Sequence, residues 1–98
     1  MTQKGYLIVE ARVSDPAAYE IYKNLAEAAI AQYGGRYLVR GGAVETLEGD
    51  WTPKRTVILE FPDMDSLKAF WNAPEYQPLR AIRQKASTGR LVAIHGYQ

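Results

Sequence analysis

Residues 5–35 read GYLIVEARVSDPAAYEIYKNLAEAAIAQYGG, and two different periodicities follow one another within this stretch. The first covers residues 5–13, where apolar side chains alternate along the chain as in a β-strand with two different faces. One predicted face is wholly apolar and consists of Leu7, Val9, Ala11 and Val13. The opposite face is mixed and consists of Tyr6, Ile8, Glu10 and Arg12.

A long helix is expected directly after this strand. Asp15 supplies a capping carboxylate, and Pro16 suits the first helical position because the missing N–H has no helical partner there. Apolar residues recur at helical spacing over residues 18–33, and polar residues that include Lys23 form the opposite stripe. The glycine pair at residues 34–35 is expected to end the helix, since glycine readily adopts the left-handed conformation common at helix C-termini.

The remaining sequence predicts three strands and two short helices, separated by Gly and Pro residues. In chain order these are a strand at 36–40 that resumes at 43–47 after a bulge, a strand at 55–61, a helix including 64–71, a helix including 78–86, and a strand at 90–95. The order β-α-β-β-α-β is the split βαβ or ferredoxin-like pattern. We therefore expect one α+β domain over residues 1–98, with an antiparallel sheet and its helices on one face.

The sheet face away from the helices is predicted to be too apolar to remain in water. Ile8 and Ile58 lie on it, with Leu38 as a further candidate. The expected partner is a second copy of the chain, packed sheet to sheet to form a small barrel. The mixed positions of the strands would then line the interior, where a small organic ligand is expected.

Composition argues against several functional classes. Twelve Lys and Arg residues against eleven Asp and Glu residues leave a net charge of +1, so no overall field attracts nucleic acid or an anionic membrane. The 98 residues include no cysteine, which excludes disulfide scaffolds and thiol catalysis. No aliphatic run approaches the length of a membrane span or signal peptide, and no nucleotide- or phosphate-binding motif is found. A cytoplasmic protein without a cofactor is expected.

Three runs of sequence carry a resemblance to a known family: YLVRGGAVETLEGDW at residues 37–51, PKRTVILEFPDMD at 53–65, and APEYQPLRAIRQKASTGRLVAIHG at 73–96. Over essentially the whole chain, the sequence resembles the bacterial domain-of-unknown-function family 1330. The resemblance implies the dimeric α+β barrel superfamily, in which ferredoxin-like protomers pair sheet to sheet. That superfamily includes cofactor-independent monooxygenases, muconolactone-type isomerases and haem-handling enzymes. The family has no assigned reaction, so the resemblance carries over no catalytic residues.

The candidate catalytic residues are Glu10, Glu60 and His95. Both glutamates interrupt the mixed face of strands that are neighbours in this fold, so their carboxylates are expected close enough to raise one pKa for general acid–base work. The alternative is a Glu–Arg network that fixes the register of a dimer, with Arg12 or Arg40 as a partner. His95 is the only histidine, and it is either an acid–base group or an ordinary satisfied or surface imidazole. One histidine does not make up a metal site.

The candidate ligand-binding residues are Arg40, Trp51, Tyr76 and Arg83. Arg83 shares a helix face with Arg80, which is either a solvated face or a site for a small anion. Trp51 lies in a predicted turn. Its ring is expected at the mouth of a pocket, across the dimer seam, or as a lid over the core. Three other tyrosines follow helical spacing and are expected to serve packing: Tyr19, Tyr22 and Tyr33.

Two functional hypotheses follow from these residues. The first is a metal-independent enzyme, monooxygenase- or isomerase-like, that acts on a small organic molecule in the barrel. The second is a non-catalytic small-molecule-binding or stress-associated dimer, in which the same charged residues are structural.

Overall fold

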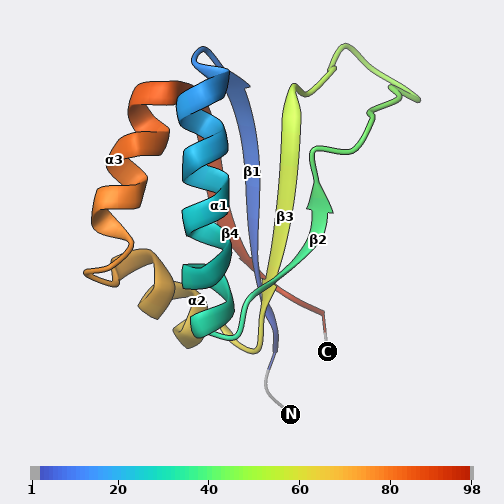
Figure 1. The fold of residues 1–98 in the computed structure, drawn as a ribbon. Coiled ribbons are helices and arrows are strands. Elements are labelled where there is room, and N and C mark those ends of the chain that lie inside the picture. Colours follow the sequence, from blue (N-terminus) through green and yellow to red (C-terminus); the bar gives the residue numbers. More distant parts are fainter. Residues whose placement is uncertain (1–2, 98) are drawn as a thin grey trace.

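The computed structural model describes residues 3–97 as a four-stranded antiparallel sheet with helices packed on one face (Figure 1). The elements are β1 (Gly5–Val13), α1 (Pro16–Gln32), β2 (Arg36–Arg40), β3 (Arg55–Phe61), α2 (Met64–Asn72), α3 (Gln77–Ala86) and β4 (Ser87–His95). The strands lie in the order β2-β3-β1-β4. This is the predicted ferredoxin-like α+β fold. Within the described residues, no helix has the length and apolar character needed to cross a membrane.

The sheet separates a buried face from an open face, and cross-strand pairing assigns residues to each. Alternate residues of β1 and β3 face the helices and are buried: Leu7, Val9, Ala11, Val57, Leu59 and Phe61. Aromatic rings of the helices complete this core, with the Phe70 ring centroid 5.5 Å from that of Phe61 and 4.4 Å from that of Tyr76. The predicted division of the first strand into an apolar and a mixed face is therefore confirmed.

Helix α1 begins and ends at the predicted signals. The Asp15 carboxylate accepts a hydrogen bond from the backbone N–H of Ala18 at 3.1 Å, and Gly34 adopts a φ of +83° after the last turn. The predicted stripes differ in detail from the structure, because the sheet and α3 cover a narrower arc than the apolar pattern spans. Ile21 is exposed, whereas Lys23, which was predicted on the polar face, projects from the side of α1 that faces the sheet.

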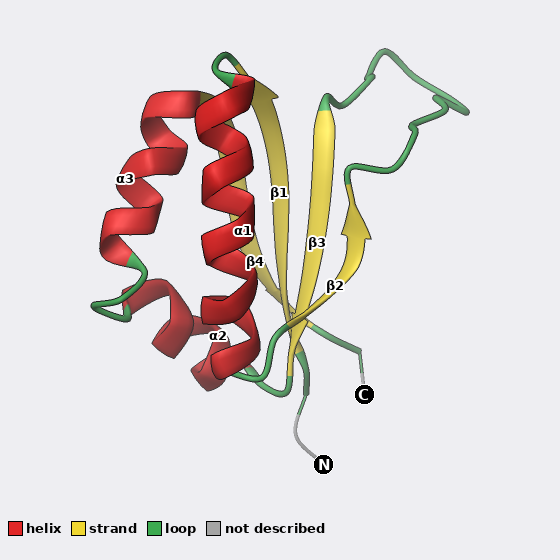
Figure 2. Cartoon of the chain, in the orientation of Figure 1, coloured by secondary structure: helices red, strands yellow, loops and turns green. Residues whose placement is uncertain are grey.

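Two predicted strand boundaries are wrong. Residues 43–47 form no strand, because Gly41, with a φ of +71°, turns the chain away from the sheet after its N–H donates to Thr56 O. Residues 41–54 instead form a long loop that projects from the body of the molecule (Figure 2). Strand β4 begins at Ser87, three residues earlier than predicted, because α3 runs directly into it without a separate turn.

Candidate functional site

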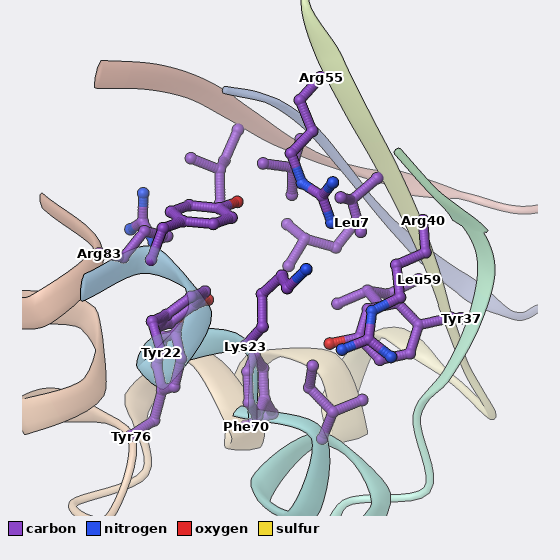
Figure 3. A pocket seen from close by; sticks show the side chains of 15 residues that line it. Leu7, Tyr22, Lys23, Tyr37, Arg40, Arg55, Leu59, Phe70, Tyr76 and Arg83 are labelled. Carbon is purple, nitrogen blue, oxygen red and sulfur yellow. The ribbon is translucent and has the colours of Figure 1, made fainter. Parts of the chain in front are cut away.

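A cavity lies inside the chain, between the helices and the covered face of the sheet (Figure 3). It encloses about 450 Å³ of empty space, which includes an opening to solvent. The centre of a water molecule can occupy about 30 Å³ of this space, so the cavity is narrow. Among residues 3–97, its lining combines aliphatic and aromatic residues with four cations and includes no carboxylate: Leu7, Val9, Tyr19, Tyr22, Lys23, Ile30, Tyr37, Arg40, Arg55, Val57, Leu59, Phe70, Tyr76, Arg83 and Leu91.

Arg55 enters the cavity from the first position of β3. It pairs with Ala11 of β1, so its side chain lies on the helix-covered face, and its guanidinium lies 5.6 Å from the centre of the Tyr19 ring. Gly41 makes room for this guanidinium, because a Cβ atom at that position would collide with Arg55 Nη1. The buried Nε of Arg55 has no hydrogen-bond partner among residues 3–97.

Arg83 enters from α3 on the other side of the cavity. Its exposed fraction is 6%, although most arginines reach water. No carboxylate within residues 3–97 forms an ion pair with it, and its Nε is buried without a hydrogen-bond partner. A solvated face was one predicted alternative for Arg83, and the structure instead buries the guanidinium because α3 packs this face against α1 and the sheet.

Lys23 and Arg40 stand where the cavity meets solvent. Each is paired with a carboxylate on α1 that is not part of the lining: Lys23 Nζ lies 3.1 Å from Glu20, and Arg40 Nη1 lies 2.6 Å from Glu27. The Arg40 guanidinium also stacks over the Tyr37 ring at 4.4 Å. Figure 3 shows both side chains reaching toward the cavity from α1 and β2.

Two tyrosine hydroxyls form a polar point within this lining. Tyr22 Oη and Tyr76 Oη are 2.9 Å apart, and Tyr76 is almost fully buried. Burial, together with the neighbouring Tyr76 hydroxyl, raises the pKa of Tyr22 far above its ordinary value, despite the opposing charge of Arg83. The Tyr22 hydroxyl therefore remains protonated at neutral pH. One hydroxyl donates to the other, and the second hydroxyl keeps a proton that it can donate to a ligand.

Three of the four predicted ligand-binding residues meet at this cavity: Arg40, Tyr76 and Arg83. The fourth, Trp51, lies in the projecting loop and is 66% exposed. Its backbone carbonyl accepts a hydrogen bond from Thr46 Oγ1 at 2.9 Å, which helps to order the loop. Trp51 is not part of the cavity.

The structure does not bring Glu10 and Glu60 together. Glu60 lies opposite Tyr6, four residues before Glu10 in β1. At a rise of about 3.3 Å per residue the two positions are about 13 Å apart, too far for their carboxylates to share a proton.

Each of these glutamates instead has its own arginine on a neighbouring strand. Arg36 Nε donates to Glu60 at 2.8 Å, and Arg90 Nε donates to Glu10 at 3.1 Å. These hydrogen bonds hold the pKa of both carboxyls below the ordinary value. Each glutamate is thus paired with an arginine, and these arginines are Arg36 and Arg90 rather than Arg12 or Arg40.

His95 lies on the other face of the sheet from both glutamates. It pairs with Gly5 at the end of β4, so it belongs to the helix-covered side. There it is exposed in a shallow depression beside Asp63 and Asp65 at the start of α2. Within the described part of the chain, no three potential ligands are grouped to hold a metal ion.

Sequence reasoning missed Arg55 and assigned Tyr19, Tyr22 and Lys23 to other roles. Arg55 carried a usable signal, because it is in phase with the buried residues Val57 and Leu59, two and four positions later. A cation in phase with a buried face is an exception that needs explanation. The tyrosines carried no separate signal, because packing and ligand contact use the same helical spacing.

The fold is shared with several solved structures of low sequence identity. A protein of unknown function from Rhodopseudomonas palustris matches with a TM-score of 0.79 at 18% identity, over 100% of this chain and 85% of that one. SnoaB, a cofactor-independent oxygenase from Streptomyces nogalater, matches with a TM-score of 0.65 at 17% identity, over 99% and 96% of the two chains. A dimeric ferredoxin-like protein of unknown function from Jannaschia matches with a TM-score of 0.67 at 14% identity, over 93% and 97%.

The family of this chain is established by a family-level match and not by an individual curated relative. No curated protein matches the chain significantly. A family match covers residues 4–97, nearly the whole sequence. The chain therefore belongs to the family described as Domain of unknown function (DUF1330).

Proposed function

We propose that the protein is a homodimer that binds a small organic molecule in the cavity between α1, α3 and the sheet of each protomer. The observation that carries this proposal is the lining of the cavity, in which aromatic rings and aliphatic side chains surround a few convergent polar groups. Ligand sites typically have this composition. The site differs from the barrel interior expected from the sequence.

The open face of the sheet supports the homodimer. Its middle row runs across all four strands and is aliphatic: Val39, Ile58, Ile8 and Val92. The ion pairs of Glu60 and Glu10 flank this row on either side along the strands. Exposed apolar rows bordered by polar groups are typical of protein interfaces. The Jannaschia protein of the same fold is itself described as dimeric.

The charges of the two faces favour the cavity over the barrel interior as the ligand site. On the open face, Glu10 and Glu60 are each satisfied by an arginine of the same protomer. In the cavity, Arg55 and Arg83 lack such partners among residues 3–97. Unsatisfied buried groups mark the place where a further binding partner contributes most.

Oxygenation without a cofactor is a second candidate activity at the same cavity. SnoaB shares the fold and is described as a cofactor-independent oxygenase. The cavity cations would stabilise a substrate anion. The described lining offers no carboxylate or histidine as a base, and the raised pKa of Tyr22 makes that phenol unsuited to the role. Binding is therefore the primary proposal, and oxygenation would need a substrate that already ionises in water.

The ligand site is tested by NMR titration of ¹⁵N-labelled protein with benzamide, a small neutral aromatic probe. We expect amide shift changes at cavity residues such as Tyr22, Tyr37 and Leu91. Side-chain methyl groups of the open face, such as those of Ile8 and Ile58 in a ¹³C-labelled sample, should not shift, because they point away from the cavity. Changes confined to the open face contradict the proposal, and so does the absence of changes with both benzamide and its charged analogue benzoate.

The homodimer is tested separately by native mass spectrometry of the wild-type protein and the Ile58→Lys variant. Lysine in the middle of the apolar row places unpaired charges at the interface, so the variant should be monomeric while the wild-type protein is dimeric. Ile21→Lys is the matched control, because Ile21 is 57% exposed on α1, away from the open face. A dimeric Ile58→Lys variant or a monomeric wild-type protein contradicts the proposed interface.

A further inference from the structure

We infer that the cavity takes a small organic oxyanion, with an apolar body and one carboxylate or similar group held by Arg55 and Arg83. This inference rests on the proposed function, because it names the chemical class of ligand for the same site. Nothing in the family description assigns such a ligand.

The charge balance of the lining is the first argument. Within the part of the chain that the structure describes, four cationic side chains face the cavity and no carboxylate does. Glu20 and Glu27 offset Lys23 and Arg40 from outside the lining. The remaining two guanidiniums leave an excess of about two positive charges next to an apolar space, which strongly favours an anion.

The burial of Arg83 is the second argument. Its side chain is more than nine-tenths buried, yet its Nε has no partner within the described chain. Arginine donates through a planar fork that fits a carboxylate with two parallel hydrogen bonds. Arg55 repeats the pattern from the opposite wall, with a buried Nε that also lacks a partner. Together the two cations flank one space.

Neutral donors add to the two arginines. The Tyr22–Tyr76 pair lies beside Arg83, whose charge acts on the Tyr22 hydroxyl. Because one hydroxyl of the pair keeps a free proton, it can donate to an oxyanion. Tyr19, under the Arg55 guanidinium, brings another phenol to the lining.

The rest of the lining selects an organic body over a bare inorganic ion. The Phe70 ring lies on the helix side of the cavity. Aliphatic side chains from β1, β3 and β4 form the opposite wall: Leu7, Val9, Val57, Leu59 and Leu91. A hydrated inorganic anion gains nothing from these contacts, whereas an apolar body is removed from water.

The test compares benzoate with benzamide, which has nearly the same shape without the charge, by NMR titration at neutral pH. Charge-assisted hydrogen bonds should make benzoate bind about tenfold more tightly or better. Arg83→Met and Arg55→Met should each reduce that preference severalfold while benzamide binding changes little. Lys85→Met is the control, because it removes one positive charge from an exposed position of α3, and it should keep the preference.

Each outcome separates this inference from the proposed function. Equal binding of benzoate and benzamide at the cavity overturns the oxyanion while leaving the ligand site intact. A preference that both arginine variants retain also overturns it. If neither probe binds, the proposed function itself is wrong. Inorganic phosphate is the last arm: displacement of benzoate by equimolar phosphate contradicts the apolar body, and weak competition supports it.

Discussion

Replacing Arg83 by methionine is expected to stabilise the unliganded protein. The guanidinium is buried, and its Nε has no hydrogen-bond partner within residues 3–97. A buried donor left unsatisfied costs about 1–3 kcal/mol. Methionine keeps an unbranched apolar stem and removes that donor, so the free energy of unfolding should rise by about 1–3 kcal/mol. For a domain of this size each kcal/mol raises Tm by about 4–8 °C.

The assay is thermal and urea unfolding in a buffer without carboxylate or phosphate, at one fixed protein concentration, because the Tm of the proposed homodimer depends on concentration. Lys85→Met is exposed on the same helix and should change stability by no more than about 0.5 kcal/mol. With benzoate at 100 times the wild-type Kd the gap between the two proteins should narrow: the wild-type protein gains about 2.7 kcal/mol, and a variant that binds fivefold more weakly gains about 1.8 kcal/mol. If Arg83→Met loses more than about 1 kcal/mol without ligand, Arg83 has a stabilising partner and the reasoning is refuted.

Three further predictions concern the fold. Gly89→Ala should lose about 1–3 kcal/mol in urea unfolding, because the new Cβ would lie 2.7 Å from the backbone oxygen of Glu10 in β1, whereas Gly42→Ala, with open space around it, should be nearly neutral. Equal stability of these two variants would contradict the close approach of β4 to β1 at Gly89. Glu60→Gln should reduce stability at neutral pH; because the folded pKa of Glu60 lies below its ordinary 4.5, the wild-type advantage is full above pH 4.5 and is lost as pH falls through the folded value. A wild-type advantage that grows toward low pH would have the wrong sign. Asp63→Ala should lose about 1 kcal/mol in thermal unfolding, because the carboxylate caps α2 by accepting from Ser66 N–H at 2.7 Å; an unchanged Tm would show that this cap contributes nothing.

The fold was predictable because its signals are local and agree with one another. Alternation in β1 and the cap and glycine signals of α1 each depend on neighbouring residues, and they specify one element order. The strand predicted at residues 43–47 does not form. These residues have the composition of a strand, but the backbone turn at Gly41 leads the chain away from the sheet. Local β-propensity does not reveal whether a neighbouring strand is present.

The candidate site was predictable only in part, because it depends on contacts between distant residues. Arg40, Tyr76 and Arg83 were identified by residue type, and the structure brings them to one cavity from β2, α3 and the segment before it. Glu10 and Glu60 were expected together because their strands are neighbours, but strand register, which separates them, was not available from the sequence. Strand register also places His95 on the opposite face of the sheet from Glu10 and Glu60.

The most direct test of the central claim is a crystal structure of the protein grown with benzoate. We expect electron density for the ligand between α1, α3 and the sheet of each copy of the chain, with the carboxylate against Arg55 and Arg83 and the ring against the aliphatic wall. Density between the two sheets of a dimer, or a carboxylate pointing to solvent with both guanidiniums unmoved, would contradict it.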